Sequence, residues 1–411
     1  MNIQEAVANF PTPFYLYDKE RLVKNCRLLK SIIPEGTELF YSVKANPLFG
    51  ICRIIKNEGL GFEIASAGEL YTVIKAGVSA NNIIFTSPGK TAKEIEFAID
   101  SGIYMIHAES FDEIELIDKI AAGKNKCVDI GIRINPVQMH SKSSIKMSGV
   151  SSQFGISEDQ LNTSFFEEIK ALEHIKVKGI QVYMGTQNLD ASSLADNTAY
   201  ILNLAVNISD EYGIALDYVN CGGGFGVNYF PHDKMLDKAL LKEKLAEIFK
   251  KYRDRLSGTR VVFESGRFIM AESAVFVTKI LYDKVSVDTR YLICDGGSNV
   301  HASSAFLGRF VRNNFPISTT ATGTSLVKVN ITGPLCTPTD LIGKGVEVPA
   351  NIAVGDYIVI EKSGAYGFTD SPFRFLSHEA PAEILVSAGE YIVLRKREQY
   401  EDILQNQNLK V

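Results

Sequence analysis

Between about residues 30 and 270, short β-rich runs alternate with longer helical stretches, and this alternation constrains the fold more than any other feature of the chain. Helical patterns such as Asp112 to Ala121, Ser192 to Tyr212 and Lys234 to Tyr252 separate most of the β-rich runs. Eight β-then-α units in about 240 residues predict a (β/α)8 TIM barrel rather than an open sheet. The expected strands are 39–44, 59–66, 82–88, 104–110, 127–136, 177–185, 218–226 and 260–270.

The pattern changes after residue 275, where helical periodicity almost disappears. Short β-rich runs separated by Gly, Asp and Pro turns predict an all-β domain. The expected strands are 274–281, 291–294, 326–331, 356–361 and 382–386, and the strand-like segment 13–17 is assigned to the same domain. We therefore expect a barrel domain at 30–272 and a β-sandwich or β-barrel domain formed by 1–29 and 273–411.

Composition excludes several classes of protein. The net charge of −5 and the scattered Lys and Arg residues give no basic field for nucleic acid. No run of about 18 apolar residues indicates a membrane span, and the N-terminus does not resemble a signal peptide, so we expect a cytoplasmic protein. The six cysteines form no CxxC pair, which indicates reduced thiols and neither a zinc site nor a disulfide framework.

Lys44 follows the apolar run 39–43, at the expected end of the first barrel strand. Lysine is rarely buried without a partner, and a Schiff base with pyridoxal 5'-phosphate (PLP) would supply one. An isolated lysine at such a place more often keeps its ammonium in water. The residues at the other strand ends decide between these two interpretations.

Polar and glycine residues occur at the carboxyl ends of five further expected strands, which is where barrel enzymes gather their functional groups. Each group alone has an ordinary structural explanation, because glycine runs are common turns and charged loops are commonly solvated. Their joint position at one rim favours a functional site. They are Glu63 and Ser66, Arg133 and Asn135, Tyr183 with Gly185 and Thr186, Gly222 to Gly226, and Glu264 to Arg267.

These residues match the chemical requirements of PLP. The aldehyde requires an amine, which Lys44 supplies, and a carboxylate such as Glu264 can keep the pyridine nitrogen protonated. The ring of Tyr183 can stack on the cofactor. The phosphate requires unobstructed backbone N–H groups, and we expect the loop of Gly222, Gly223 and Gly224 to supply them as it enters a helix, with donors added by Arg267 and Tyr366.

The chain resembles the fold-type III PLP-dependent decarboxylases, the family of diaminopimelate, ornithine and arginine decarboxylases. The resemblance implies a homodimer with active sites at the interface, to which the partner contributes residues like Cys336 and Tyr366. It also implies that Cys336 donates the proton and that Glu63, Arg133, Thr186 and Gly266 belong to the cofactor site. Seven motifs carry it, in the order of the family, at 40–46, 61–66, 153–155, 221–226, 264–267, 333–336 and 364–367.

The residue after Cys336 is Thr337, where diaminopimelate and ornithine decarboxylases have the Glu or Asp that holds the distal ammonium. Ser303 and Phe306 stand near the positions of the Arg and Tyr that bind a distal carboxylate. The chain is more similar to the branch that acts on masked amino acids. That branch includes the glutamyl-carrier-protein decarboxylase of butirosin synthesis and the citryl-diamino acid decarboxylases of siderophore synthesis.

We therefore expect an L-amino acid whose distal end is acylated or thioesterified, first a citryl-diamino acid such as N-citryl-ornithine in siderophore synthesis and second a carrier-bound glutamate, with an acyl carrier protein as a possible partner. A citryl substrate would need basic groups, and the candidates on loops that could face the mouth of the site are Lys142, Lys146, His301, Arg309 and Arg312. Any one of them alone is more often solvated surface charge. Diaminopimelate decarboxylase is the alternative enzyme, and a non-catalytic PLP-binding protein is the alternative class, against which Cys336 and Tyr366 argue. The predicted substrate-binding residues are Asp295, His301, Arg309, Arg312, Thr337 and Asp340.

Overall fold

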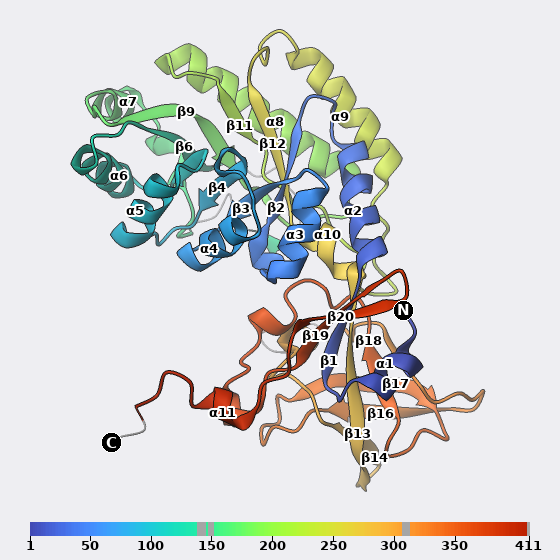
Figure 1. Ribbon diagram of the computed structural model, residues 1–411. Helices are drawn as coiled ribbons and strands as arrows, with labels where there is room; N and C mark the ends of the chain where they lie inside the picture. The colour runs from blue at the N-terminus through green and yellow to red at the C-terminus, as the bar shows by residue number, and fades with distance from the viewer. Residues whose placement is uncertain (138–144, 147–151, 306–312, 409–411) are drawn as a thin grey trace. The chain divides into compact units, whose positions relative to one another are not determined.

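The computed structural model describes residues 1–137, 145–146, 152–305 and 313–408, and its chain forms two compact units (Figure 1). The barrel unit consists of Asn25–Asn228 and Lys234–Ile269. The β unit consists of Met1–Lys24, Tyr229–Asp233 and Met270–Val411. The divisions fall inside α2 (Lys19–Ile32), after Asn228 and Asp233, and inside α10 (Arg267–Met270).

Eight parallel strands close into a barrel, which confirms the predicted (β/α)8 fold. Each strand pairs with the next, and the last pairs with the first through Glu264 beside Phe40. Most of their residues are buried, because strands covered on both faces need apolar side chains in both directions. The strands are β2 (Glu38–Ser42), β3 (Gly61–Ile64), β4 (Ile83–Thr86), β5 (Met105–Ala108), β6 (Val128–Asn135), β9 (Ile175–Val182), β11 (Tyr218–Asn220) and β12 (Arg260–Ser265).

Helices follow the strands and form the outer layer of the barrel unit (Figure 1). Several begin at a side chain that accepts a hydrogen bond from the first turn, as Ser66, Thr91, Ser110 and Asp190 do. These caps fix where the chain leaves each strand-end loop. The helices are α3 (Phe49–Asn57), α4 (Ala67–Lys75), α5 (Ala92–Ser101), α6 (Phe111–Gly123), α7 (Thr163–Lys170), α8 (Ala191–Tyr212) and α9 (Lys238–Tyr252).

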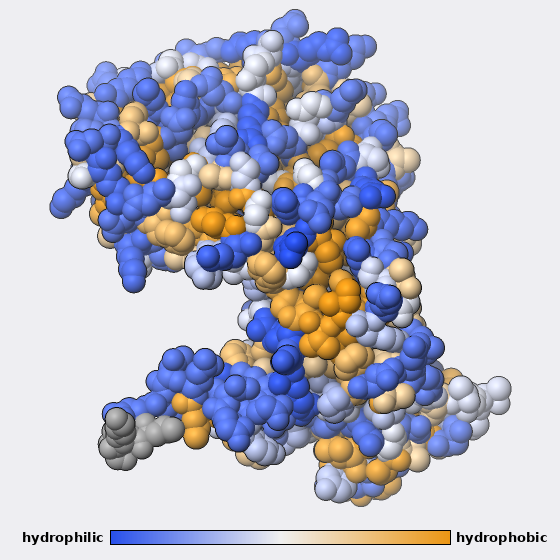
Figure 2. Space-filling model, in the orientation of Figure 1, coloured by the Kyte–Doolittle hydropathy of each residue, from blue (hydrophilic) through white to orange (hydrophobic). Residues whose placement is uncertain are grey.

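Short elements complete the barrel unit. β8 (Ile156–Ser157) pairs with the end of β6, and β10 (Gly185–Thr186) pairs with β7 (Ile145–Lys146) in a separate two-stranded sheet. The outward side of the helices is largely hydrophilic in the view of Figure 2. The 3-10 turns of this unit are η1 (Val43–Ala45), η2 (Ala80–Asn82) and η3 (Glu158–Gln160).

The β unit is built on one sheet in which the N-terminal strand is central. β1 (Phe14–Asp18) pairs antiparallel with β13 (Ala274–Ser286) and parallel with β19 (Ala382–Ser387). The strand order is β17-β16-β14-β13-β1-β19-β20, and β18 joins β13 and β15. The remaining strands are β14 (Thr289–Cys294), β15 (Ile317–Thr319), β16 (Leu326–Thr332), β17 (Leu341–Pro349), β18 (Tyr357–Ile360) and β20 (Glu390–Arg395).

Helices in the β unit are short. α1 (Ile3–Asn9) buries Ala6 against a cluster that includes Phe14 and Leu16 of β1, and α11 (Tyr400–Ile403) follows β20. No helix in the described part of the chain has the length and apolar character needed to cross a membrane. The 3-10 turns are η4 (Ala271–Ser273), η5 (Ala302–Ser304), η6 (Phe368–Asp370) and η7 (Phe375–Ser377).

Candidate active site

Lys44 lies in the turn η1 directly after β2. Its neighbours Val43 and Ala45 are buried, whereas 46% of the Lys44 side chain is exposed. The Nζ atom donates a hydrogen bond to Oε1 of Glu63 on β3, over 3.3 Å. The amine is therefore held at the carboxyl ends of two adjacent barrel strands, with one face open.

Two buried carboxyl groups lie near this amine. Glu63 is 1% exposed, and its Oε2 atom has no hydrogen-bond partner among the described residues. Glu264 on β12 is 3% exposed, and burial together with the nearby charge of Glu63 raises its pKa. Lys44, Arg133 and a hydrogen bond from Asn220 act in the opposite direction. A cationic or hydrogen-bond-donating group between these carboxyls would be stabilised.

The glycine loop after β11 packs so closely that side chains are excluded. A Cβ atom would lie 2.4 Å from the Val182 carbonyl oxygen at Gly222, 2.1 Å from that of Glu264 at Gly223, and 2.5 Å from that of Gly185 at Gly224. Gly222 and Gly224 also have φ values of +59° and +95°, which favour glycine.

The expectation that this loop enters a helix is wrong. An irregular segment follows it, and α9 begins at Lys238. Any phosphate held here would therefore depend on the backbone of the loop itself rather than on the N-terminus of a following helix.

Gly266 follows β12 directly and packs against the turn that contains Lys44. A Cβ atom at Gly266 would lie 2.7 Å from the Cβ of Ala45 and 3.0 Å from the carbonyl oxygen of Ser42. Arg267 is the first residue of α10. The absence of a side chain at Gly266 thus allows Lys44 and the start of α10 to approach each other.

Tyr183 follows the last residue of β9 and lies against the glycine loop, since a Cβ at Gly222 would be 3.3 Å from its ring. Burial raises the pKa of the Tyr183 hydroxyl, although Lys44 and a hydrogen bond with Thr186 lower it. Tyr183 is therefore a neutral aromatic ring near the lysine, as the stacking role requires.

Arg133 lies on β6 and is already engaged by protein groups. Its Nη1 atom donates to both carboxylate oxygens of Glu109, at 2.7 and 2.8 Å, and its guanidinium lies 5.0 Å from the centre of the Phe154 ring. Glu109 also accepts from the backbone N–H of Gly155. This pairing fixes Arg133 at the rim, and a direct contact with a cofactor stays a prediction.

In the β unit, Cys336 is exposed and Thr337 is half-buried. The Thr337 hydroxyl is 2.9 Å from that of Thr339. Asp340 is 2% exposed, and its two oxygens accept from the backbone N–H groups of Ser298 and Leu335. Asp340 thus joins two loops. Both of its oxygens are already engaged by the protein backbone, so Asp340 is not held in reserve for a substrate ammonium.

Asp295 and Tyr366 have different surroundings within the β unit. Asp295 accepts hydrogen bonds from the hydroxyls of Thr12 and Thr278 and from the backbone of Lys279, which is a structural arrangement. Tyr366 is half-buried with a φ of +53°. Such a backbone is unfavourable for a bulky residue and is often found at functional positions.

The expectation that His301 is a basic group open to a substrate is wrong. His301 is 0% exposed, its Nε2 atom is 2.8 Å from the Ser363 hydroxyl, and its ring stacks on Tyr15. Burial lowers its pKa to about 4, so the ring is neutral at neutral pH. Arg309, Arg312, Phe306 and Lys142 lie outside the described residues, as does the side chain of Lys146.

Four further residues near this site were not predicted, one at the start of a helix and three in the barrel interior. Glu69 on α4 accepts from the backbone of Ala65, and burial raises its pKa to about 7. His107, Tyr218 and Asn220 form hydrogen bonds that lead to Glu264. One signal was available in the sequence, because Tyr218 and Asn220 are polar residues two apart, on one face of a barrel strand.

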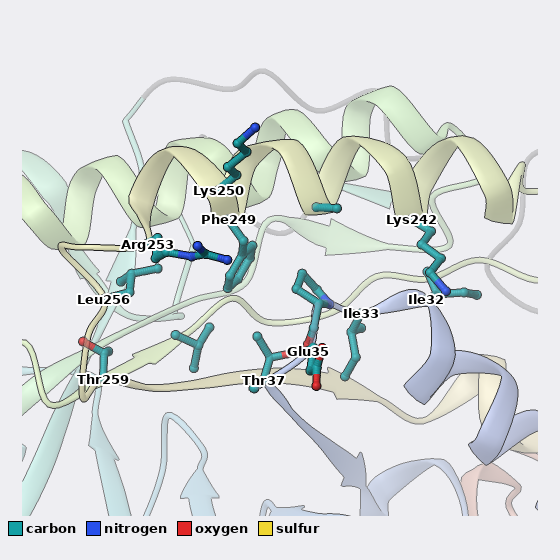
Figure 3. A pocket seen from close by; sticks show the side chains of 14 residues that line it. Ile32, Ile33, Glu35, Thr37, Lys242, Phe249, Lys250, Arg253, Leu256 and Thr259 are labelled. Atoms are coloured by element: carbon teal, nitrogen blue, oxygen red, sulfur yellow. Dashed lines mark hydrogen bonds between the residues drawn. The ribbon is translucent and has the colours of Figure 1, made fainter.

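A pocket of about 560 Å³ lies at the opposite, amino ends of the strands (Figure 3). It is lined by the segment before β2, including Glu35 and Thr37, by α9 residues such as Phe249, and by Arg253 directly after α9. It is therefore separate from the residues around Lys44. Within the described ranges, no group of three or more His, Cys, Asp or Glu side chains is arranged to hold a metal ion.

Known proteins match this arrangement over nearly its whole length. The family model "Pyridoxal-dependent decarboxylase, pyridoxal binding domain" matches residues 19–271. The L-glutamyl-[BtrI acyl-carrier protein] decarboxylase of Niallia circulans is 41% identical, with 99% of this chain and 97% of the relative covered.

A second relative and a solved structure agree with the family match. The 2-[(L-alanin-3-ylcarbamoyl)methyl]-2-hydroxybutanedioate decarboxylase of Staphylococcus aureus is 30% identical, with 92% of this chain and 94% of the relative covered. The structure of diaminopimelate decarboxylase from Helicobacter pylori with L-lysine is 27% identical, with a TM-score of 0.88 and 98% of both chains covered.

Proposed function

The chain belongs to the pyridoxal-dependent decarboxylases, and we propose that its substrate is an L-amino acid whose distal end is masked by a thioester or an acyl group. The first candidate is a glutamate bound to a carrier protein through its side chain, and the second is a citryl-diamino acid. The observation that carries the proposal is Thr337, a neutral side chain at the position that follows Cys336.

The barrel unit has groups that fit PLP. Lys44 presents a half-exposed amine, and Glu63 has a buried oxygen without a partner among the described residues, which a bound group would satisfy. Gly223 and Gly224 are partly exposed and have no side chain to cover their backbone, so they are the part of the loop that could face an anion, whereas the N–H of Gly222 already donates to Asn220. When bound, PLP supplies the electron sink needed for loss of CO2 from Cα.

Each of these residues has a distinct proposed role. Lys44 holds the cofactor covalently between turnovers. Glu264 keeps the ring nitrogen protonated, and Tyr183 packs on one face of the ring. The glycine loop, Gly266 and Arg267 bind the phosphate. Contacts from Glu63, Arg133 and Thr186 complete the cofactor site.

We also propose a homodimer in which Cys336 and Tyr366 serve the active site of the partner. The exposed thiol of Cys336 supports this assignment, because a proton donor must be reachable by the substrate. Exposed apolar side chains on β13, Leu281, Tyr282 and Val285, are the kind of surface that a second copy would cover. In this dimer Cys336 returns a proton to the carbon that loses CO2.

A free diamino acid would require an anionic partner for its distal ammonium. Thr337 offers only a hydroxyl, which already lies within hydrogen-bond distance of Thr339, and both oxygens of nearby Asp340 accept from backbone amides. These contacts favour a substrate whose distal end carries no positive charge. The name of the relative at 41% identity, which acts on a carrier-bound glutamyl group, supports the same choice.

The order of the two candidates is the reverse of the one expected from the sequence, and the reason is His301. A citryl group carries several carboxylates and would be held by basic side chains. His301 was one of the groups predicted for that purpose, and it is buried and neutral. A glutamyl thioester makes no such demand, so it is placed first.

The test is CO2 release from a panel of substrates by the PLP-loaded protein, with a Lys44→Ala variant as the control. The panel comprises a glutamyl carrier-protein thioester, N-citryl-ornithine, N-citryl-diaminopropionate, free ornithine and meso-diaminopimelate. We expect at least one masked substrate to exceed both free diamino acids in kcat/KM by roughly a thousandfold. If meso-diaminopimelate reacts as efficiently as the masked substrates, the proposal is wrong and the chain acts as a diaminopimelate decarboxylase.

A further inference from the structure

A line of buried polar side chains extends through the interior of the barrel and ends at Glu264. Its members come from the neighbouring strands β4 and β5 and the neighbouring strands β11 and β12, so the line joins two pairs of strands that lie apart in the barrel. Each is at most 6% exposed. In order, they are Thr86, His107, Tyr218, Asn220 and Glu264.

The orientation of the Asn220 amide is fixed by the glycine loop. Its Oδ1 atom accepts from the backbone N–H of Gly222 at 2.8 Å. Its Nδ2 atom must therefore face the other way, where it donates to Oε1 of Glu264 at 2.7 Å and to the Tyr218 hydroxyl at 2.9 Å. Among the described residues, this is the one side-chain hydrogen bond to Glu264.

The direction of the remaining hydrogen bonds follows from this amide. Because the Tyr218 oxygen accepts from Asn220, its hydrogen is available to Nε2 of His107, at 3.1 Å. Nε2 is then an acceptor, so the ring proton lies on Nδ1, which donates to the Thr86 hydroxyl at 2.6 Å. With this tautomer, each hydrogen bond in the line has one donor and one acceptor.

The surroundings of His107 keep it neutral. Burial lowers its pKa, and the positive charges of Lys90 and Arg133 lower it further. Lys90 donates to the His107 carbonyl oxygen and to the carboxylate of Glu113, while Glu109 pairs with Arg133. Gly131 on β6 makes room for the ring, because a Cβ there would lie 2.8 Å from it.

We propose that Asn220, Tyr218, His107 and Thr86 are positioning residues that hold the Glu264 carboxylate in one orientation and in its anionic form, ready for the ring nitrogen of PLP. The inference rests on the proposed role of Glu264. Its chemical basis is the amide of Asn220, which stabilises the anion through a hydrogen bond and cannot rotate without breaking bonds to Gly222 and Tyr218. The line is a static support, and no proton needs to travel along it.

The first test is Tyr218→Phe, which keeps the ring and removes the hydroxyl. We expect kcat to fall about tenfold with little change in KM, corresponding to the loss of about one net hydrogen bond. Loss of this support raises the pKa of Glu264, so the acid limb of the pH–rate profile should move to higher pH. The pH dependence of the visible absorption of bound PLP should move in the same direction, which gives a readout without turnover.

The matched control is Tyr200→Phe on α8, which also removes a hydroxyl that donates to a carboxylate, that of Glu158, at 2.6 Å. This control should leave kcat and the absorption titration unchanged. Equal effects in both variants, or no effect in a folded, PLP-loaded Tyr218→Phe protein, would overturn the proposal.

A second variant covers the case in which Tyr218→Phe does not fold. Thr86→Val is close to isosteric and removes the acceptor for the His107 Nδ1 proton at the far end of the line. We expect a smaller fall in kcat, about twofold to threefold, with the same direction of spectral shift. In a folded double variant, Thr86→Val should add nothing to Tyr218→Phe, because the line is already broken. Additive effects would indicate two independent packing changes and contradict the proposal.

Glu264→Gln distinguishes the failure of this inference from the failure of the assignment beneath it. If Glu264→Gln leaves the absorption titration and kcat unchanged, the role of Glu264 is wrong. If Glu264→Gln has a large effect and neither Tyr218→Phe nor Thr86→Val has any, the role of Glu264 stands and the positioning line is wrong.

Discussion

Replacing Glu264 by Gln changes one charge and almost nothing else in the structure. The amide oxygen of Gln can still accept from Asn220 Nδ2, so the orientation of the side chain is retained. What is lost is the anion that, in the proposed role of Glu264, would stabilise the protonated ring nitrogen of PLP. Breaking a buried ion pair by removing one partner costs about 3–5 kcal/mol. At about 1.4 kcal/mol per factor of ten, turnover should fall by roughly two to three and a half orders of magnitude.

Glu264→Gln lowers turnover of the loaded enzyme, but it should not lower the free energy of unfolding of the PLP-free protein at pH 7. Burial and the charge of Glu63 raise the pKa of Glu264 above its value in the unfolded chain. The folded protein therefore binds the Glu264 proton more tightly than the unfolded chain does. This contribution to the free energy of unfolding is fully present below the unfolded pKa of about 4.3, and it is lost as the pH rises toward neutrality. Glu264→Gln removes this loss, so the variant without PLP should be at least as stable as wild type at pH 7.

The measurements are steady-state decarboxylation of the loaded enzyme and thermal unfolding of the PLP-free protein between pH 4.5 and 8. Glu167→Gln on the exposed surface of α7 is the control for the same chemical change, and it should alter neither quantity. Wild-type turnover in Glu264→Gln would refute the charge argument. A variant whose PLP-free form is clearly less stable at pH 7 would refute the description of Glu264 as a destabilising buried anion.

Three further changes test other parts of the site. Borohydride reduction of the PLP-loaded protein should fix the cofactor on Lys44, seen by peptide mass spectrometry, and a label on another lysine would refute the assignment. Gly223→Ala should weaken PLP binding at least about tenfold, measured by titration, because its Cβ would lie 2.1 Å from a carbonyl oxygen, whereas Gly123→Ala, which has open space, should not. Thr337→Glu should move the ratio of kcat/KM toward free ornithine by roughly a hundredfold or more, and an unchanged ratio would contradict the role given to Thr337.

The barrel was predictable because its strands leave a clear mark on the sequence. In runs such as the one that ends at Ser42, consecutive residues are buried, so the side chains on both faces of the strand are covered. The helices between them begin at Ser, Thr or Asp residues that cap the first turn, which sets the period of the alternation. Both signals are local, so one sequence sufficed to give all eight strands.

The two errors concern residues whose environment depends on distant parts of the chain. The glycine loop was expected to enter a helix because glycines often precede one, but α9 begins only at Lys238. His301 lies in a polar segment with several Ser residues and was expected to be exposed. Its actual neighbours, Tyr15 and Ser363, are 286 and 62 positions away in the sequence, and nothing local indicates that they enclose it.

The line from Thr86 to Glu264 was missed for the same reason. Each member lies on a strand that was correctly expected, but the hydrogen bond that completes the line, between His107 on β5 and Tyr218 on β11, crosses the barrel between strands that are not adjacent. Which polar residues meet inside a closed barrel depends on the register of all its strands. A single sequence identifies the strands much more readily than it identifies that register.

The position of β1 between β13 and β19 has a consequence for synthesis. Phe14 pairs with Ala382, which is 368 residues further along the chain. The ribosome therefore releases the first strand of this sheet long before its parallel neighbour exists, while the whole barrel unit, which ends at Ile269, can already fold. Until the last strands emerge, the N-terminal segment has an unpaired apolar edge that is open to chaperones or to other chains. The two ends of the chain therefore depend on each other in this sheet: loss of β1 would separate β13 from β19, and loss of β19 would leave the outer edge of β1 unpaired.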